Sequence, residues 1–107
     1  MGGFVYLYIT NPTREEARKI ARHLLRKKLV ACANILGPAT SLYPWKGKLA
    51  DEEEWILIAK TTEKLAEEAT KETEKIHSYT VPCVVKIPAS PNKKYGEWLE
   101  SLVGKGK

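Results

Sequence analysis

The sequence is poor in several residue types that mark particular classes of protein. Its 107 residues include two cysteines, Cys32 and Cys83, without a C-x-x-C pair, so a disulfide-rich scaffold and a paired-cysteine zinc site are both excluded. We expect both thiols to be buried as small apolar groups, and their number alone leaves a disulfide between them open. No apolar run approaches the roughly 18–20 residues of a membrane-spanning helix, and residues 1–4 lack the basic segment of a secretory signal. These absences predict a cytoplasmic globular protein.

Catalytic motifs are missing as well. The sequence contains no glycine-rich phosphate loop, no H-E-x-x-H pair and no serine nucleophile elbow. Nothing in it argues for hydrolysis or group transfer, and we expect a non-enzymatic protein that requires no cofactor. Glutamine is absent and methionine occurs once, which is typical of a thermostable protein because these side chains are thermolabile.

The length and the charge bound what is present. The 107 residues, 43% of them hydrophobic, suit one domain over residues 1–107 with a core of its own. Of the 18 Lys and Arg residues, nine fall in residues 1–50 beside two acidic residues, while the other nine share residues 51–107 with eleven acidic ones. A basic half of this kind can face nucleic acid, or it can meet the acidic half of a second copy in a homo-oligomer.

The hydrophobic pattern of the first half predicts a strand, a helix and a hairpin. Residues 4–10 form an apolar and aromatic run typical of a central strand buried on both faces. Thr13 and Glu16 form a capping box that predicts a helix from residue 14, with basic residues on its outer face and a core stripe of Ala17, Ile20, Ala21, Leu24 and Leu25. A buried strand over residues 29–36, interrupted at Gly37-Pro38, continues to Trp45, turns at Lys46-Gly47 and returns through residues 55–60.

The second half predicts a helix, a strand and a short helix. Thr61 or Thr62 caps the second helix, His77 ends it, a strand covers residues 81–87, and Asn92 caps the last helix. The order is that of an α+β, ferredoxin-like βαββαβ sandwich with an additional C-terminal helix. Because the strands are apolar on both sides and the last helix is too short to cover the second face, we expect other copies of the chain to bury that face.

Candidate ligands for a metal are few. His77 either provides a cationic cap for the end of its helix or contributes to a ligand site completed by another subunit, and the acidic residues 51–54 are expected to form a solvated charged run. The βαββαβ order also occurs in RNA-recognition modules. Residues 54–61 do not match their aromatic RNP1 pattern, so RNA binding by the basic first helix is a minor alternative.

Several motifs, taken in order, carry a resemblance to a known family. They are A-C-A-N-I at residues 31–35, S-L-Y-P-W-K-G-K at residues 41–48, Glu54, K-T at residues 60–61, H-S-Y-x-x-P at residues 77–82 and Y-x-x-W-L at residues 95–99. In this order and spacing the chain resembles the CutA divalent-cation-tolerance family over most of its length.

The resemblance implies a tight homotrimer similar to the PII signalling proteins, with the long hairpins reaching across to neighbouring subunits. It also implies tolerance or weak binding of divalent metal ions, chiefly Cu²⁺, with His77 as a ligand. Some copper-binding relatives carry Cys and His where this chain has Ile9 and Ile76, so the affinity for copper should be low.

The matched polar and aromatic residues are the usual components of a ligand pocket, here between subunits, and the alternative is that they only pack the trimer interface. They are Tyr43, Trp45, Glu54, Lys60, His77, Tyr79 and Trp98. A second function remains open: a PII-like sensor or scaffold that binds a small anionic metabolite at the subunit clefts.

Overall fold

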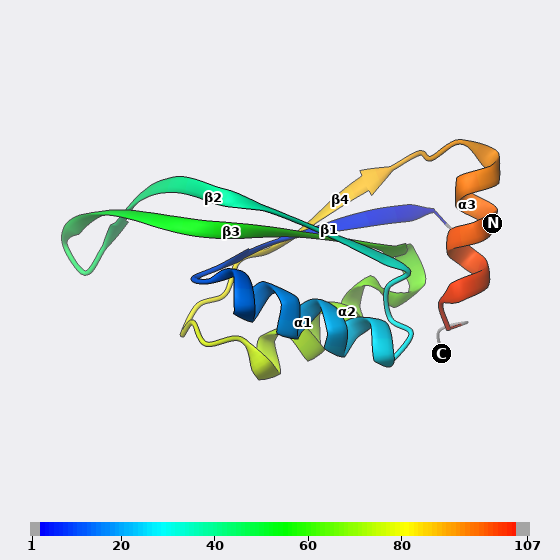
Figure 1. Cartoon of the computed structure of the whole chain (residues 1–107), viewed down its shortest axis with the longest axis horizontal. Coiled ribbons are helices and arrows are strands. Elements are labelled where there is room, and N and C mark those ends of the chain that lie inside the picture. The colour runs from blue at the N-terminus through cyan, green and yellow to red at the C-terminus, as the bar shows by residue number, and fades with distance from the viewer. Residues whose placement is uncertain (1–2, 105–107) are drawn as a thin grey trace.

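Four antiparallel strands form one sheet, and the computed structural model describes the chain over residues 3–104. The elements are β1 (Phe4–Asn11), α1 (Arg14–Arg26), β2 (Cys32–Trp45), β3 (Lys48–Thr62), α2 (Glu63–Ile76), β4 (Val84–Ala89) and α3 (Lys93–Leu102). The strand order is β2-β3-β1-β4 with every neighbouring pair antiparallel, which confirms the predicted ferredoxin-like fold. Helices α1 and α2 cover one face of the sheet, and α3 lies beyond one end of it (Figure 1).

Strands β2 and β3 form the predicted long hairpin, which projects past the helices (Figure 1). Their pairing runs out to Trp45 opposite Lys48, and both turn residues have positive φ, 51° at Lys46 and 78° at Gly47, as a two-residue hairpin turn requires. Gly37-Pro38 does not interrupt β2, contrary to the prediction; it forms a bulge where the register shifts between Leu36 and Ala39.

The core lies between the sheet and the helices α1 and α2. Alternate residues of β1 are buried there, and Leu57 of β3 and Leu24 of α1 are fully enclosed. Two predictions are wrong in detail. Leu25 is 39% exposed, because it lies one residue past the buried stripe. Leu29 and Val30 are buried but precede β2, so their apolar character reflects core packing in a loop.

Helices α1 and α2 leave the opposite face of the sheet uncovered, and α3 packs only on one end of it, where Lys60 donates to the Tyr95 hydroxyl. Tyr8 of β1 pairs with Ile58 on one side and with Val85 on the other, and directly opposed residues share a face. Val85 is 46% exposed. Strand β1 is apolar on both sides, but only the side that faces α1 and α2 is fully buried. We call the other side of the sheet the open face.

The first helix is capped as the sequence predicts, but its capping box is half made. The Glu16 backbone N–H donates to Thr13 Oγ1 at 3.0 Å. The Glu16 carboxylate accepts bonds from the backbone N–H and the hydroxyl of Ser78, both at 2.9 Å. The Glu16 carboxylate thus links α1 to the segment after α2. In a complete capping box it would instead accept a hydrogen bond from the backbone N–H of the capping residue.

Helices α1 and α2 are joined through Glu72 of α2. Its carboxylate lies 2.8 Å from His23 Nε2 of α1 and 3.0 Å from Lys75 Nζ, and its side chain is 12% exposed. The hydrogen bonds to His23 and then to Lys75 lower the pKa of Glu72 from 4.5 to about 2. The carboxylate is therefore held in its charged form by groups of both helices.

This lowered pKa predicts an acid-dependent stability. A depressed pKa stabilises the fold fully above the ordinary value of 4.5 and loses that effect as the pH falls toward about 2. We expect Glu72→Gln to unfold at lower denaturant concentration than the wild type at pH 7, with the difference closing over that acidic range. Denaturant unfolding at a series of pH values measures this. The matched control is Glu67→Gln on the same helix, whose side chain is 85% exposed; a Glu72→Gln deficit independent of pH would contradict the prediction.

Candidate functional site

A pocket of about 530 Å³ lies between the hairpin arm and the segment that follows α2. Four of the predicted pocket residues line it: Tyr43, Trp45, Glu54 and Tyr79. The other lining residues are Thr10, Ala50, Glu52, Ser78, Thr80, Val81 and Cys83. We call it the acidic aromatic pocket, and within one chain it already assembles most of the predicted site.

Two tyrosine–carboxylate pairs form the polar part of this pocket. Glu52 and Glu54 are two residues apart on β3 and so lie on the same face of the strand. The Tyr43 hydroxyl donates to Glu52 Oε1 at 2.7 Å, and the Tyr79 hydroxyl donates to Glu54 Oε2 at 2.6 Å. The bond to Glu52 raises the pKa of Tyr43, and burial together with the bond to Glu54 raises the pKa of Tyr79. Both phenols therefore remain protonated donors at neutral pH.

Of the two pocket carboxylates, that of Glu54 belongs to the buried residue, which is 6% exposed. Its Oε2 accepts a hydrogen bond from the neutral Tyr79 phenol. Among the described residues, Asn11 Oδ1 is the atom that is buried without a hydrogen-bond partner, and Glu54 Oε1 is not such an atom. Among the described residues that line the pocket there is no Lys, Arg or His, and no ion pair recorded for the described residues involves Glu54. A buried carboxylate without a cation is costly, and Glu54 is one of the residues that line the pocket.

His77 lies behind the pocket wall. Its side chain is fully buried, its Nε2 lies 2.7 Å from the Thr10 carbonyl oxygen, and the Tyr79 backbone N–H donates to its Nδ1 at 3.1 Å. Because a carbonyl can only accept, Nε2 carries a proton, and a Glu16 carboxylate oxygen also lies 3.3 Å from Nδ1. The ring also packs on Tyr79 with centroids 4.8 Å apart. The His77 side chain thus positions Tyr79, whereas its backbone N–H caps α2 by donating to the Thr73 carbonyl oxygen at 3.0 Å.

Lys60 and Trp98, the remaining predicted pocket residues, lie in a separate group on the open face. Lys60 Nζ sits 5.2 Å from the Tyr6 ring centroid and 5.3 Å from that of Tyr95, and it donates to the Tyr95 hydroxyl at 3.4 Å. Trp98 packs on Tyr95 with ring centroids 5.4 Å apart. We call Tyr6, Lys60, Tyr95 and Trp98 the Lys60 cluster. The residues predicted to form one pocket therefore lie in two separate groups within one chain.

The potential soft metal ligands are spread out. Cys32 and Cys83 are both free and half-buried, so no disulfide joins them and neither is as buried as expected. Cys83 lines the acidic aromatic pocket, whereas Cys32 lies opposite Lys60. Ile9 is fully buried in the core. In residues 3–104 no three or more His, Cys, Asp and Glu side chains are grouped to hold a metal ion, and His77 as a metal ligand stays a prediction.

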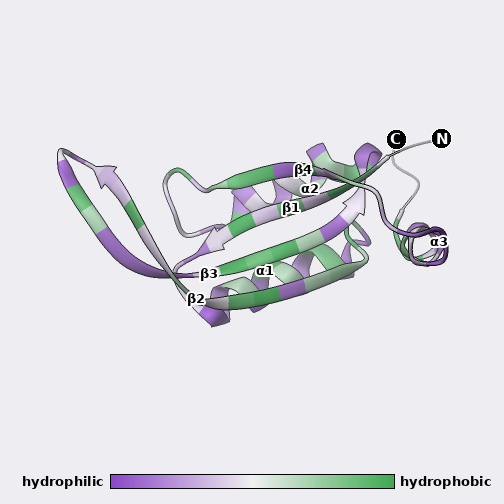
Figure 2. Cartoon of the chain, turned by 90° about the horizontal axis from the view of Figure 1, so that it is seen from above, coloured by the Kyte–Doolittle hydropathy of each residue, from purple (hydrophilic) through white to green (hydrophobic). Residues whose placement is uncertain are grey.

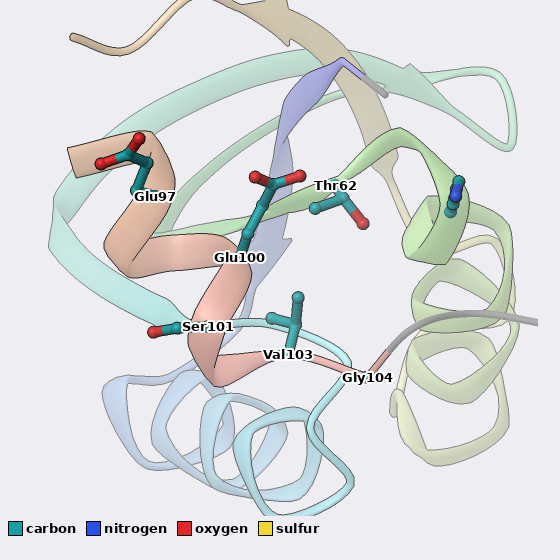
Figure 3. Close-up of a pocket in the computed structure, with 7 residues that line it drawn as sticks. Thr62, Glu97, Glu100, Ser101, Val103 and Gly104 are labelled. Carbon is teal, nitrogen blue, oxygen red and sulfur yellow. The ribbon is translucent and has the colours of Figure 1, made fainter. Parts of the chain in front are cut away.

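A second cavity, of about 380 Å³, lies where α3 meets the start of α2. Glu97, Glu100 and Ser101 project from α3, and Thr62 lies across from them (Figure 3). It contains none of the predicted site residues, and both of its carboxylates belong to exposed residues. We therefore place the candidate site in the acidic aromatic pocket.

Sequence reasoning missed Glu52 and Cys83 as pocket residues. Glu52 belongs to the acidic run that we expected to be solvated, and the hydrophilic stretch of the hairpin arm is visible in Figure 2. The signal was the two-residue spacing between Glu52 and Glu54, which places both on one face of a strand. Cys83 carried no comparable signal, because its position depends on the path of the loop before β4.

Comparisons with known proteins give one consistent family. The family described as CutA1 divalent ion tolerance protein matches residues 5–102. The "Divalent-cation tolerance protein CutA" of Archaeoglobus fulgidus is 40% identical over 99 residues, covering 92% of this chain and 96% of that protein. The crystal structure of divalent ion tolerance protein CutA1 from Ehrlichia chaffeensis superposes with a TM-score of 0.92 at 36% identity, covering 97% of this chain and 98% of that one.

A plant relative is longer. "Protein CutA, chloroplastic" of Arabidopsis thaliana is 38% identical over 98 residues, which is 91% of this chain but 54% of that protein. The chain thus spans about half of that relative. No helix among residues 3–104 has the length and apolar character needed to cross a membrane.

Proposed function

The chain belongs to the CutA1 divalent ion tolerance protein family, and from this premise we propose that it is a cytoplasmic, non-enzymatic homotrimer that binds divalent metal ions weakly, copper foremost. The acidic aromatic pocket is the proposed binding place. The observation that carries the proposal is the buried Glu54 carboxylate, which lines the pocket and has a phenol, not a cation, as its recorded partner. A cation that enters supplies the missing counter-charge.

The ligand set accounts for weak binding. Glu52 and Glu54 supply carboxylate oxygens and Cys83 supplies one thiol from the lining, which is a mixed and incomplete set for Cu²⁺. His77 can join only if the metal displaces the Tyr79 N–H from Nδ1, since Nε2 holds its proton against Thr10. The non-enzymatic part of the proposal is supported by the lack of catalytic motifs in the sequence.

Calorimetric titration of CuCl₂ tests this proposal. Because a charged ligand contributes more than a neutral one, Glu54→Gln should weaken binding by about tenfold or more. Glu53→Gln is the matched control, since Glu53 neighbours Glu54 on β3 but does not line the pocket. Unchanged affinity in Glu54→Gln would refute the assignment of the pocket. A His77→Ala variant with wild-type affinity would remove His77 from the ligand set and leave the carboxylate site standing.

The Lys60 cluster favours a second candidate, the sensor of small anions. The partners recorded for the Lys60 ammonium are two aromatic rings and a phenol, and none of them is a carboxylate. Burial works to lower the pKa of Lys60, but the Tyr95 hydrogen bond and the neighbouring Cys32 outweigh it, so the pKa is raised. A cation held between rings on the open face suits an anionic group at a subunit cleft, whereas the acidic aromatic pocket suits the opposite charge.

A further inference from the structure

The walls of the acidic aromatic pocket have a chemistry that a metal ion does not use. Three aromatic side chains, Tyr43, Trp45 and Tyr79, line it together with Ala50 and Val81. A bare divalent ion requires a shell of oxygen, nitrogen or sulfur ligands, and it gains little from rings and methyl groups. The residues that surround the two carboxylates are therefore unexplained by metal binding.

Aromatic rings beside a carboxylate are the recognition chemistry of an organic cation. The negative face of a ring attracts an ammonium group while its surface buries the attached alkyl carbons. Trp45 already attracts such a group from its own chain, since Lys46 Nζ lies 6.0 Å from the centroid of its ring. Trp45 is 46% exposed in the single chain.

We infer that the acidic aromatic pocket binds an alkylammonium ion, with the charge against Glu54 and the alkyl chain against the rings of Tyr43, Trp45 and Tyr79. Glu54 supplies a buried carboxylate that is bonded to the Tyr79 phenol, and no lining Lys, Arg or His in the described residues competes for it. The cavity of about 530 Å³ is within the usual size range for a small organic ligand. This inference goes beyond the metal proposal and stands without it.

Three probes of equal chain length separate charge from shape: n-butylammonium chloride, n-butanol and sodium butyrate. The readout is the indole N–H signal of Trp45 in a ¹H–¹⁵N spectrum, identified by its loss in Trp45→Phe. We expect saturable shifts with n-butylammonium, and at least about tenfold weaker binding of butanol and of butyrate, since an ion pair adds to the apolar contact. Equal shifts with butanol would overturn the inference, because the pocket would then be a merely apolar cleft.

Two variants test the role of the carboxylate. Glu54→Gln should weaken n-butylammonium binding by about tenfold or more, with Glu53→Gln as the matched control. Tyr79→Phe keeps the ring and releases Glu54 Oε2 from its hydrogen bond, so the affinity should be equal or higher. Wild-type affinity in Glu54→Gln, or loss of binding in a folded Tyr79→Phe, would overturn the inference. Calorimetry with CuCl₂ on the same samples distinguishes the two proposals: n-butylammonium binding without copper binding supports this one alone, and the reverse result overturns it.

Discussion

Truncation of Leu24 to alanine should lower the free energy of unfolding by about 2–5 kcal/mol, the range for deleting a buried leucine side chain. Leu24 is fully enclosed between α1 and the sheet, so its removal loses apolar burial and leaves a cavity. Denaturant unfolding at one fixed protein concentration measures the loss, since the stability of an oligomer depends on concentration.

The neighbouring residue provides a matched control. Leu25 is on the same helix, undergoes the same substitution with the same change in helix propensity, and is 39% exposed. We expect Leu25→Ala to cost less than about 1 kcal/mol, as is usual away from the core. Equal losses in the two variants would mean that the face of α1 toward the sheet is not the one that the structure shows.

The pair also shows where sequence reasoning about helices ends. The spacing of Ala17, Ile20, Ala21, Leu24 and Leu25 predicts a core stripe, and the structure buries its first four members. The width of the stripe depends on how deeply the helix sits on the sheet, which side-chain spacing does not encode. Similarly, Leu29 and Val30 are buried without belonging to a strand. An apolar run in the sequence predicts burial, but it does not distinguish a buried loop from a buried strand.

The site was predictable to the extent that it depends on neighbours along the chain. Tyr43 and Trp45 lie two residues apart near the end of β2, and the hairpin turn that pairs β2 with β3 was readable at Lys46-Gly47. The distance of Lys60 and Trp98 from that group follows from the length of the hairpin arm and the position of α3, which are properties of the tertiary structure. His77 was recognised as a site residue, but its bonds to Thr10 and Tyr79 depend on two loops meeting.

The open face of the sheet predicts the effect of a single charge on assembly. Val85 and Ile87 lie two residues apart on β4 and are 46% and 45% exposed, and exposed apolar surfaces that adjoin one another mark interaction sites. In the proposed homotrimer this face is buried against the other copies. We expect Val85→Glu to convert a particle with three times the mass of one chain into a particle with the mass of one chain.

The reason is the cost of burying an unpaired carboxylate, which amounts to several kcal/mol and occurs once in each copy. In the separate chain the same side chain is half exposed on edge strand β4, so the fold should persist. Light scattering at micromolar concentration measures the mass, and far-ultraviolet circular dichroism checks the fold. Leu25→Glu on the helical side is the control and should keep the wild-type mass. A wild-type protein with the mass of one chain would refute the trimer, and a Val85→Glu variant that remains a trimer would exclude this face from the interface.

The same variant decides whether the acidic aromatic pocket is complete within one chain. Its tyrosines, its tryptophan and both carboxylates come from the hairpin arm and the segment after α2 of a single copy, and none of them is on β4. Binding of CuCl₂ and of n-butylammonium should therefore survive in the Val85→Glu chain, within about threefold of the wild type, because no pocket contact is removed. If a folded single chain binds neither ligand, the pocket requires a neighbouring subunit. The sequence-based prediction, which placed Lys60 and Trp98 in the same site, would then describe the functional site better than the single chain does.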